Sequence, residues 1–174
     1  MNGLVHIYCG DGKGKTTAAL GLALRACGGG YQVVLAQFMK AWDTAELKIL
    51  RELQNITVLR GDFPAKFSKD YTKEEREAVI RENNRLFQEA VSGIAAGVKT
   101  LLILDEMIGT MDIQLIDRDM VYHFLENRTC DTEVVLTGRN PSERLIGLAD
   151  YVSEIRKIRH PYEKGIAARK GIEF

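Results

Sequence analysis

Residues 10–17 read Gly-Asp-Gly-Lys-Gly-Lys-Thr-Thr, between the apolar runs 4–9 and 18–24. This order predicts a strand, a glycine-rich loop and a helix, the setting in which a loop binds phosphate. Glycines let successive backbone N–H groups turn toward an anion, and the helix N-terminus adds partial positive charge. Lys15 would then reach phosphate oxygens, and the Thr16 hydroxyl would bind Mg²⁺. The stretch therefore predicts a site for a nucleoside triphosphate.

The loop departs from the general P-loop pattern, which has a glycine, four residues and then Gly-Lys-Ser/Thr. Counting back from Gly14 places Cys9 at the first position, and the glycine comes one residue later, at Gly10. Gly12 and Lys13 are also unusual in such a loop. The alternative interpretation is a glycine-rich turn with a solvated lysine. We favour phosphate binding, because strand, loop and helix fall where the mechanism needs them.

Length and composition indicate an ordinary globular protein. The 174 residues suit one domain, spanning 1–174, with a sizeable core. Because 24 basic residues balance 24 acidic ones, no charge excess points to nucleic acid or to a membrane surface. The three cysteines form no Cys-x-x-Cys pair, and neither a signal sequence nor a membrane-spanning segment is apparent. We therefore expect a cytoplasmic protein.

Apolar runs alternate with helical patterns along the chain. Further strands are expected at 33–39, 56–59, 101–104, 133–137 and 151–158. After the helix that the glycines 28–30 end, further helices are expected at 45–53, 72–96 and 117–127, and directly after 140–141. Thr72 and Glu75 match a capping box at the start of the longest helix. Buried strands between helices imply an α/β fold of the P-loop NTPase (RecA-like) type, a mainly parallel sheet with helices on both faces.

Ligands of such sheets bind at the carboxyl ends of the strands. The phosphate loop, residues 37–40, Asp105-Glu106 and residues 137–139 should all meet there. An apolar run ending in two acidic residues is the second signature of a P-loop protein, because a carboxylate at that point holds Mg²⁺ directly or through water. The alternative makes Asp105 a helix N-cap and Glu106 a surface charge.

Two arginines are candidates for nucleotide contact. Arg25 follows the loop by about two and a half helical turns, so it either binds nucleotide or is a solvated helix residue. Arg139 follows a glycine at a strand end and would contact phosphate or form a salt bridge.

Four aromatic residues lie in expected loops rather than in strands: Trp42, Phe63, Phe67 and Tyr71. Core packing is one explanation for them. The other is a large, flat, apolar partner molecule near the open edge of the sheet.

Taken together, these segments resemble the ATP:corrinoid adenosyltransferases of the bacterial cobalamin pathway, over nearly the whole chain. The segments most specific to this resemblance are 10–19, 37–40, 104–106, 136–139, 149–154, 160–162 and 171–174. The shifted first glycine, which breaks the general P-loop pattern, is a feature of this family.

The resemblance implies transfer of the 5′-deoxyadenosyl group of ATP to the Co(I) centre of a corrinoid, with release of triphosphate, in cobalamin biosynthesis or salvage. It also implies that the nucleotide lies reversed relative to ordinary P-loop ATPases. The nucleotide contacts implied by position are Gly10, Asp11, Gly12, Lys13, Gly14, Lys15, Thr16, Thr17, Arg25 and Arg139. The implied Mg²⁺ ligands are Thr16, Glu106 and Asp105, and the implied catalytic residues are Lys15 and Glu106. The corrinoid would lie over the loop 60–71, with contacts from Trp42, Phe63 and Phe67.

The chain also departs from the family. Many relatives carry an N-terminal extension that helps to cover the corrinoid, whereas this sequence starts almost at its first strand. Some relatives have a Phe-x-Trp arrangement in the corrinoid loop, and here neither Phe63 nor Phe67 is followed by tryptophan in this way. With the resemblance we expect a flavoprotein reductant and a homodimer. The competing functions are a P-loop kinase or ATPase that acts at the γ-phosphate, and a nucleotide-binding module without chemistry.

Overall fold

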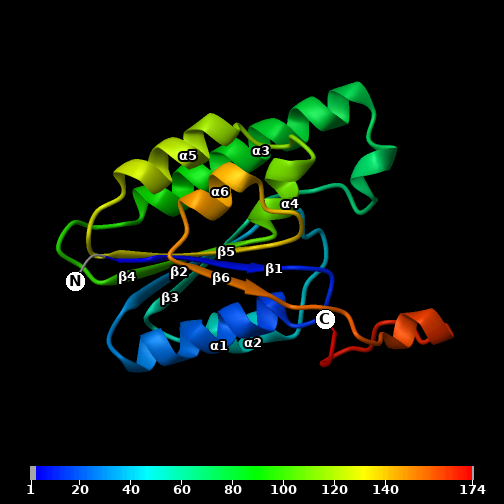
Figure 1. Cartoon of the computed structure of the whole chain (residues 1–174), viewed down its shortest axis with the longest axis horizontal. Helices are drawn as coiled ribbons and strands as arrows, with labels where there is room; N and C mark the ends of the chain where they lie inside the picture. Colours follow the sequence, from blue (N-terminus) through cyan, green and yellow to red (C-terminus); the bar gives the residue numbers. More distant parts are fainter. Residues whose placement is uncertain (1–2, 174) are drawn as a thin grey trace.

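A single parallel sheet organises the computed structural model of the chain, which describes residues 3–173 (Figure 1). The strands are β1 (Val5–Cys9), β2 (Gln32–Gln37), β3 (Ile56–Arg60), β4 (Thr100–Asp105), β5 (Thr132–Thr137) and β6 (Tyr151–Glu154). They lie in the order β3-β2-β4-β5-β1-β6, and every neighbouring pair is parallel. The strand before the phosphate loop and the strand that ends in Asp105 are therefore separated by β5.

Helices cover both faces of the sheet, as the alternating pattern predicted (Figure 1). Helices α1 (Lys15–Gly28) and α2 (Glu46–Leu50) lie on one face. The other face carries α3 (Lys73–Ser92), α4 (Met107–Asp112), α5 (Arg118–Asn127) and α6 (Glu143–Gly147). Short 3₁₀ turns span Ser68–Asp70 and Pro161–Lys164.

The core has two layers because successive strand residues point to opposite faces. In β2, Val33 and Leu35 pack with residues of α1, whereas Val34 and Ala36 pack with residues of α3, α4 and α5. All of β4 is buried, including its last residue, Asp105. The continuous apolar run in this strand is what a parallel strand covered on both faces requires.

Several element boundaries differ from the sequence expectations. The capping box of Thr72 and Glu75 is confirmed, since the Thr72 hydroxyl accepts from Glu75 N and the Glu75 carboxylate accepts from Thr72 N. Helix α3 ends at Ser92, with Gly93 as its C-cap, and does not continue to residue 96. The last strand ends at Glu154 rather than at residue 158. Helix α4, which follows β4 directly, was not predicted.

The segment after β6 runs beside the phosphate loop. Ile155 N donates to the Cys9 carbonyl oxygen (2.8 Å), and Gly12 N donates to the Ile155 carbonyl oxygen (2.8 Å). Lys157 N donates to Asp11 Oδ1 (2.9 Å). Backbone groups of Ile155 and Lys157 therefore hold residues 9–12, the first part of the loop, in place.

Within residues 3–173, no helix is both long and apolar enough to cross a membrane.

Candidate active site

The phosphate loop turns from β1 into α1 by means of two glycines with positive φ. Gly10 has a φ of 104° and Gly14 a φ of 124°, values that side-chain-bearing residues rarely adopt. A Cβ at Gly10 would lie 2.4 Å from the Ile155 carbonyl oxygen, so the loop also needs glycine there for space. The first turn of α1 contains no acidic residue, and no side chain caps it. Its N–H groups are therefore oriented for an anion.

Lys15, the first residue of α1, lies over this loop. Its Nζ donates to the Gly12 carbonyl oxygen (2.7 Å), which keeps the ammonium group at the mouth of the loop. Partial burial lowers its pKa, while the nearby Glu106 carboxylate raises it. A partly desolvated cation at the N-terminus of a helix attracts phosphate oxygens strongly.

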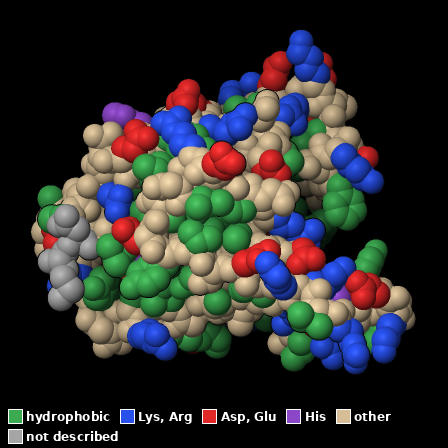
Figure 2. Space-filling model, viewed as in Figure 1, with side chains coloured by type: hydrophobic (Ala, Val, Ile, Leu, Met, Phe, Trp, Pro, Cys, Tyr) green, Lys and Arg blue, Asp and Glu red, His purple; other side chains and the backbone are tan. Residues whose placement is uncertain are grey.

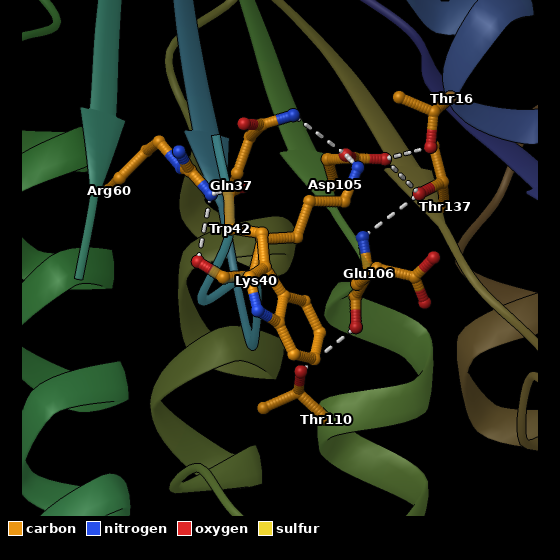
Figure 3. Close-up of polar contacts among 9 residues, drawn as sticks. All are labelled: Thr16, Gln37, Lys40, Trp42, Arg60, Asp105, Glu106, Thr110 and Thr137. Carbon is orange, nitrogen blue, oxygen red and sulfur yellow. Dashed lines mark hydrogen bonds and ion pairs between the residues drawn. The ribbon is translucent and has the colours of Figure 1, made fainter. Parts of the chain in front are cut away.

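Asp105 is the fully buried centre of the polar network at the carboxyl edge of the sheet (Figure 3). Its Oδ1 accepts from Thr16 Oγ1 (2.8 Å) and Thr137 Oγ1 (2.7 Å). Its Oδ2 accepts from Gln37 Nε2 (3.2 Å) and Lys40 Nζ (2.5 Å). These four donors come from α1, β5, β2 and the loop after β2, so one carboxylate joins most of the elements that build the site.

Glu106 differs from Asp105 in backbone and in side chain. Its φ of 63° is left-handed, a conformation that costs about 1–2 kcal/mol for a non-glycine residue. Two hydrogen bonds with side chains hold this backbone: Glu106 N donates to Thr137 Oγ1 (2.9 Å), and Thr110 Oγ1 donates to the Glu106 carbonyl oxygen (2.9 Å) (Figure 3). Among residues 3–173, none donates a hydrogen bond to its carboxylate. Burial, and then the neighbouring Asp105, raise the pKa of this carboxyl.

The oxygen atoms at this point suit Mg²⁺. The Thr16 hydroxyl donates its hydrogen bond to Asp105, so the lone pairs of its oxygen remain available to a cation. The Glu106 carboxylate is a second oxygen donor of the kind that Mg²⁺ prefers. Asp105, by contrast, has both oxygens engaged and is placed to orient Thr16. Thr16 and Glu106 would therefore serve as direct Mg²⁺ ligands better than Asp105 would.

A pocket of about 390 Å³ opens beside Glu106. Its lining includes Glu106 and Arg139 together with the aromatic residues Trp42, Phe67 and Tyr71. Trp42 is 62% exposed and Phe67 is 75% exposed, so broad apolar surface faces solvent here. Figure 2 shows a hollow between the segment around Ser68–Asp70 and the segment around Pro161–Lys164.

The structure separates the two phenylalanines of the loop 60–71. Phe63 is only 6% exposed and belongs to the core beneath α3, with Val79. It does not line the pocket that Trp42 and Phe67 share. Of the three expected corrinoid contacts, two are therefore brought together at the pocket, and Phe63 packs in the interior.

The residues expected to contact the nucleotide do not all lie near the phosphate loop. Arg139 is exposed at the end of β5, close enough to influence the pKa values of both Lys15 and Glu106. Thr17 lines a second cavity of about 340 Å³ beside the loop, and Lys13 is exposed. Arg25 is exposed on α1, ten residues from Lys15 and hence about 15 Å along the helix. The structure does not bring Arg25 to the loop.

Sequence reasoning missed Arg60, the last residue of β3. Its Nη2 donates to the carbonyl oxygens of Lys40 (2.8 Å) and Trp42 (2.6 Å) (Figure 3). Its Nη1 donates to Asp43 Oδ1 (2.9 Å). Arg60 thus fixes the backbone that carries Trp42. A basic residue at a strand end was the available signal, but the sequence does not show which carbonyls it meets.

Comparison with known proteins agrees with this geometry. A family model described as "ATP:corrinoid adenosyltransferase BtuR/CobO/CobP" matches residues 1–174. The corrinoid adenosyltransferase of Escherichia coli K12 is 30% identical over 177 residues, covering 99% of this chain and 86% of that protein. Corrinoid adenosyltransferase CobA of Salmonella typhimurium LT2 is 30% identical with the same coverage. A corrinoid adenosyltransferase of Sinorhizobium is 33% identical, covering 99% and 80%.

Similar folds occur among solved structures. The cytoplasmic domain of EssC matches with a TM-score of 0.50 at 14% identity, covering 97% of this chain and 35% of that one. EssC (ATPases 2 and 3) from Geobacillus thermodenitrificans matches with a TM-score of 0.51, also at 14% identity and with the same coverage. These likenesses confirm the P-loop NTPase-like, RecA-like α/β fold.

Proposed function

The chain belongs to the ATP:corrinoid adenosyltransferase family, and on that premise we propose how its own residues carry out the reaction of the family. The enzyme transfers the 5′-deoxyadenosyl group of ATP to the cobalt of a corrinoid, in cobalamin biosynthesis or salvage. The observation that carries the residue assignment is the shared pocket. Glu106 and Arg139, which follow β4 and β5 at the phosphate-binding edge, line the same pocket as Trp42 and Phe67, which form its aromatic side.

The reaction is a displacement at the ribose C5′ carbon. An electron pair of Co(I) forms the Co–C5′ bond, the C5′–O bond breaks, and its electron pair leaves with the triphosphate, so that cobalt ends as Co(III). The charge that develops is on the leaving oxygen of the triphosphate. Catalysis therefore depends on groups that stabilise that charge and on alignment of cobalt, C5′ and oxygen.

The phosphate loop supplies the stabilising groups. N–H groups between Gly10 and Thr17, other than that of Gly12, which donates to Ile155, bind the triphosphate together with the Lys15 ammonium, and Arg139 adds a second cation after β5. Thr16 and Glu106 would hold Mg²⁺, which when bound neutralises part of the triphosphate charge. Asp105 orients Thr16 through its hydrogen bond. Arg25 is left outside this set because of its distance along α1.

The aromatic side binds the corrinoid. A flat macrocycle needs broad apolar contact, and exposed rings provide it with few rotatable bonds to freeze. Trp42 and Phe67 are the exposed rings at the pocket. Contact with the lower face of the corrinoid would displace the lower axial ligand of cobalt and make Co(II) easier to reduce. A flavoprotein supplies the electron, and the enzyme acts in the cytoplasm as a homodimer.

The test is analysis of the products from ATP and a chemically reduced corrinoid, with Mg²⁺ present. Adenosyl transfer yields triphosphate and an adenosylated corrinoid in equal amounts, which phosphorus NMR and the corrinoid absorbance spectrum measure separately. ADP, with phosphate or with a phosphorylated acceptor, would instead indicate an ATPase or a kinase at the γ-phosphate. Binding without any product would indicate a nucleotide-binding module.

A further inference from the structure

Lys40 is the second lysine beside the phosphate loop, and the reaction described above gives it no role. Its Nζ lies 2.5 Å from Asp105 Oδ2 and forms an ion pair with that carboxylate (Figure 3). The two partners differ in exposure: the Asp105 side chain is fully buried, whereas the Lys40 side chain is 20% exposed. Lys40 therefore reaches the buried network from the solvent side.

The Lys40 side chain borders cavities beside the phosphate loop. Lys40 lines the cavity of about 340 Å³ that also contains Thr16 and Thr17, and it lines an adjoining cavity of about 650 Å³ with Trp42. Each cavity is large enough for a phosphate group. Because Lys40 lines both cavities, its side chain borders each of these spaces while Nζ is paired with Asp105.

The backbone around Lys40 is fixed, so that a movement of this residue is confined to the side chain. Met39, the preceding residue, has a left-handed φ of 57°. Arg60 Nη2 holds the Lys40 carbonyl oxygen at 2.8 Å. The lysine ammonium group, on its flexible four-carbon stem, can then change partners while the backbone stays in place.

Asp105 does not depend on Lys40 alone. Thr16, Thr137 and Gln37 still donate to it when the lysine turns away. Gln37 Oε1 is buried and has no hydrogen-bond partner in the described chain, so the network also contains one spare acceptor.

Resting on the proposed function, we propose that Lys40 is a second triphosphate ligand: it pairs with Asp105 in the conformation seen here and moves to the triphosphate when nucleotide binds. The triphosphate carries several negative charges where Asp105 carries one, so it competes for the ammonium group effectively. Lys40 then stabilises the leaving group together with Lys15.

Calorimetric titration with two probes, MgATP and inorganic tripolyphosphate with Mg²⁺, tests the proposal. Lys40→Met should weaken both by about 10- to 100-fold, the usual effect of losing a hydrogen bond to a charged group. Lys40→Arg should recover most of the affinity. Lys48→Met, which removes an exposed lysine on α2, is the matched control and should bind as wild type does.

A double variant separates phosphate contact from simple neutralisation of Asp105. In Lys40→Met/Asp105→Asn the buried charge is gone, Thr16 and Thr137 keep an acceptor, and a flipped Gln37 amide can present its spare Oε1 to the new NH₂ group. The double variant should regain the thermal stability that Lys40→Met loses, because it has no unpaired buried charge. If Lys40 binds phosphate, the double variant should still bind tripolyphosphate weakly.

The proposal is overturned if the double variant binds tripolyphosphate as Asp105→Asn does, or if Lys40→Met binds both probes like wild type. These outcomes differ from failure of the proposed function, which would appear in the wild-type enzyme as an absence of triphosphate from ATP and reduced corrinoid.

Discussion

The nucleotide side and the aromatic side of the site are built in opposite ways. On the nucleotide side, Asp105 is fully buried and accepts four hydrogen bonds, and the loop is held by backbone bonds from Ile155. On the aromatic side, Trp42 and Phe67 are mostly exposed, and the backbone of Trp42 is held by Arg60. One side is organised before its ligand arrives, and the other presents rings that a ligand must cover.

This difference matches the two demands of the reaction. A leaving triphosphate is stabilised best by groups that need no rearrangement as charge develops. A corrinoid is large and must enter and leave, so its contacts have to be accessible. Substitutions on the nucleotide side should therefore affect turnover or folding, whereas those on the aromatic side should affect corrinoid binding with little change in the free energy of unfolding.

The largest effect is expected for Lys15→Ala. Loss of a preorganised charge at the leaving group should lower kcat/KM by about 10²–10³-fold, with an unchanged unfolding transition. Lys13→Ala is the matched comparison in the same loop, because Lys13 is exposed, and its loss should be smaller than tenfold. Kinetics with saturating reduced corrinoid measure both. Wild-type turnover in Lys15→Ala would remove the loop from the reaction.

The adjacent carboxylates should respond differently. Asp105→Ala leaves Lys40 and three neutral donors without their acceptor and should cost about 3 kcal/mol of unfolding free energy. Glu106→Ala should leave stability near wild type but raise the Mg²⁺ concentration for half-maximal activity at least about tenfold. Chemical denaturation and Mg²⁺ titration distinguish them. A wild-type Mg²⁺ curve for Glu106→Ala would exclude it as a ligand.

Glu106→Asn sharpens this comparison, because asparagine tolerates left-handed φ better than glutamate does. The variant should be at least as stable as wild type while losing activity. A clear loss of stability would instead show that the Glu106 side chain contributes to folding.

Phe67 tests the aromatic side, and the buried Phe63 of the same loop is the comparison. Phe63→Ala removes a buried ring and should cost about 3 kcal/mol of unfolding free energy. Phe67→Ala should leave stability and ATP affinity unchanged, yet weaken the absorbance change that marks four-coordinate Co(II). If Phe67→Ala reduces the corrinoid normally, the corrinoid must be held elsewhere.

The smallest effect is expected for Arg60→Met. It frees the carbonyl oxygens of Lys40 and Trp42, so the loop should become more mobile while the sheet remains intact. Trp42 is the one tryptophan of the sequence, so a lower fluorescence anisotropy would report this directly. Turnover should fall only a few-fold. Unchanged anisotropy would show that Arg60 does not position Trp42.

Local signals in the sequence predicted the α/β fold class and the positions of most strands and helices. Strand, loop and helix around residues 10–17 were found because glycine and lysine spacing is dictated by phosphate chemistry. The capping box at Thr72 was found because it lies within four residues. Helix α4 was missed because its N-cap residue, Glu106, has a left-handed backbone and no capping side-chain hydrogen bond. That backbone is held by Thr137, which is distant in the sequence, and by Thr110, which lies downstream.

The sequence predicted which residues belong to the site, but not which role each of two similar residues has. Asp105 and Glu106 are neighbours, and an apolar run followed by two acidic residues does not show which of the two carboxylates accepts hydrogen bonds from the surrounding side chains. Phe63 and Phe67 lie in the same irregular loop, and their opposite exposures depend on how α3 packs against it. Such differences arise from tertiary contacts, which periodicity and spacing do not encode.

The most direct test of the central claim is to identify the bond of ATP that breaks. ATP carrying oxygen-18 at the bridge between C5′ and the α-phosphorus is incubated with Mg²⁺, reduced corrinoid and enzyme, and the products are examined by mass spectrometry. Displacement at C5′ predicts that all of the label leaves in triphosphate and none enters the adenosylated corrinoid. Label retained on the adenosine product would show cleavage at phosphorus and contradict this account of the site.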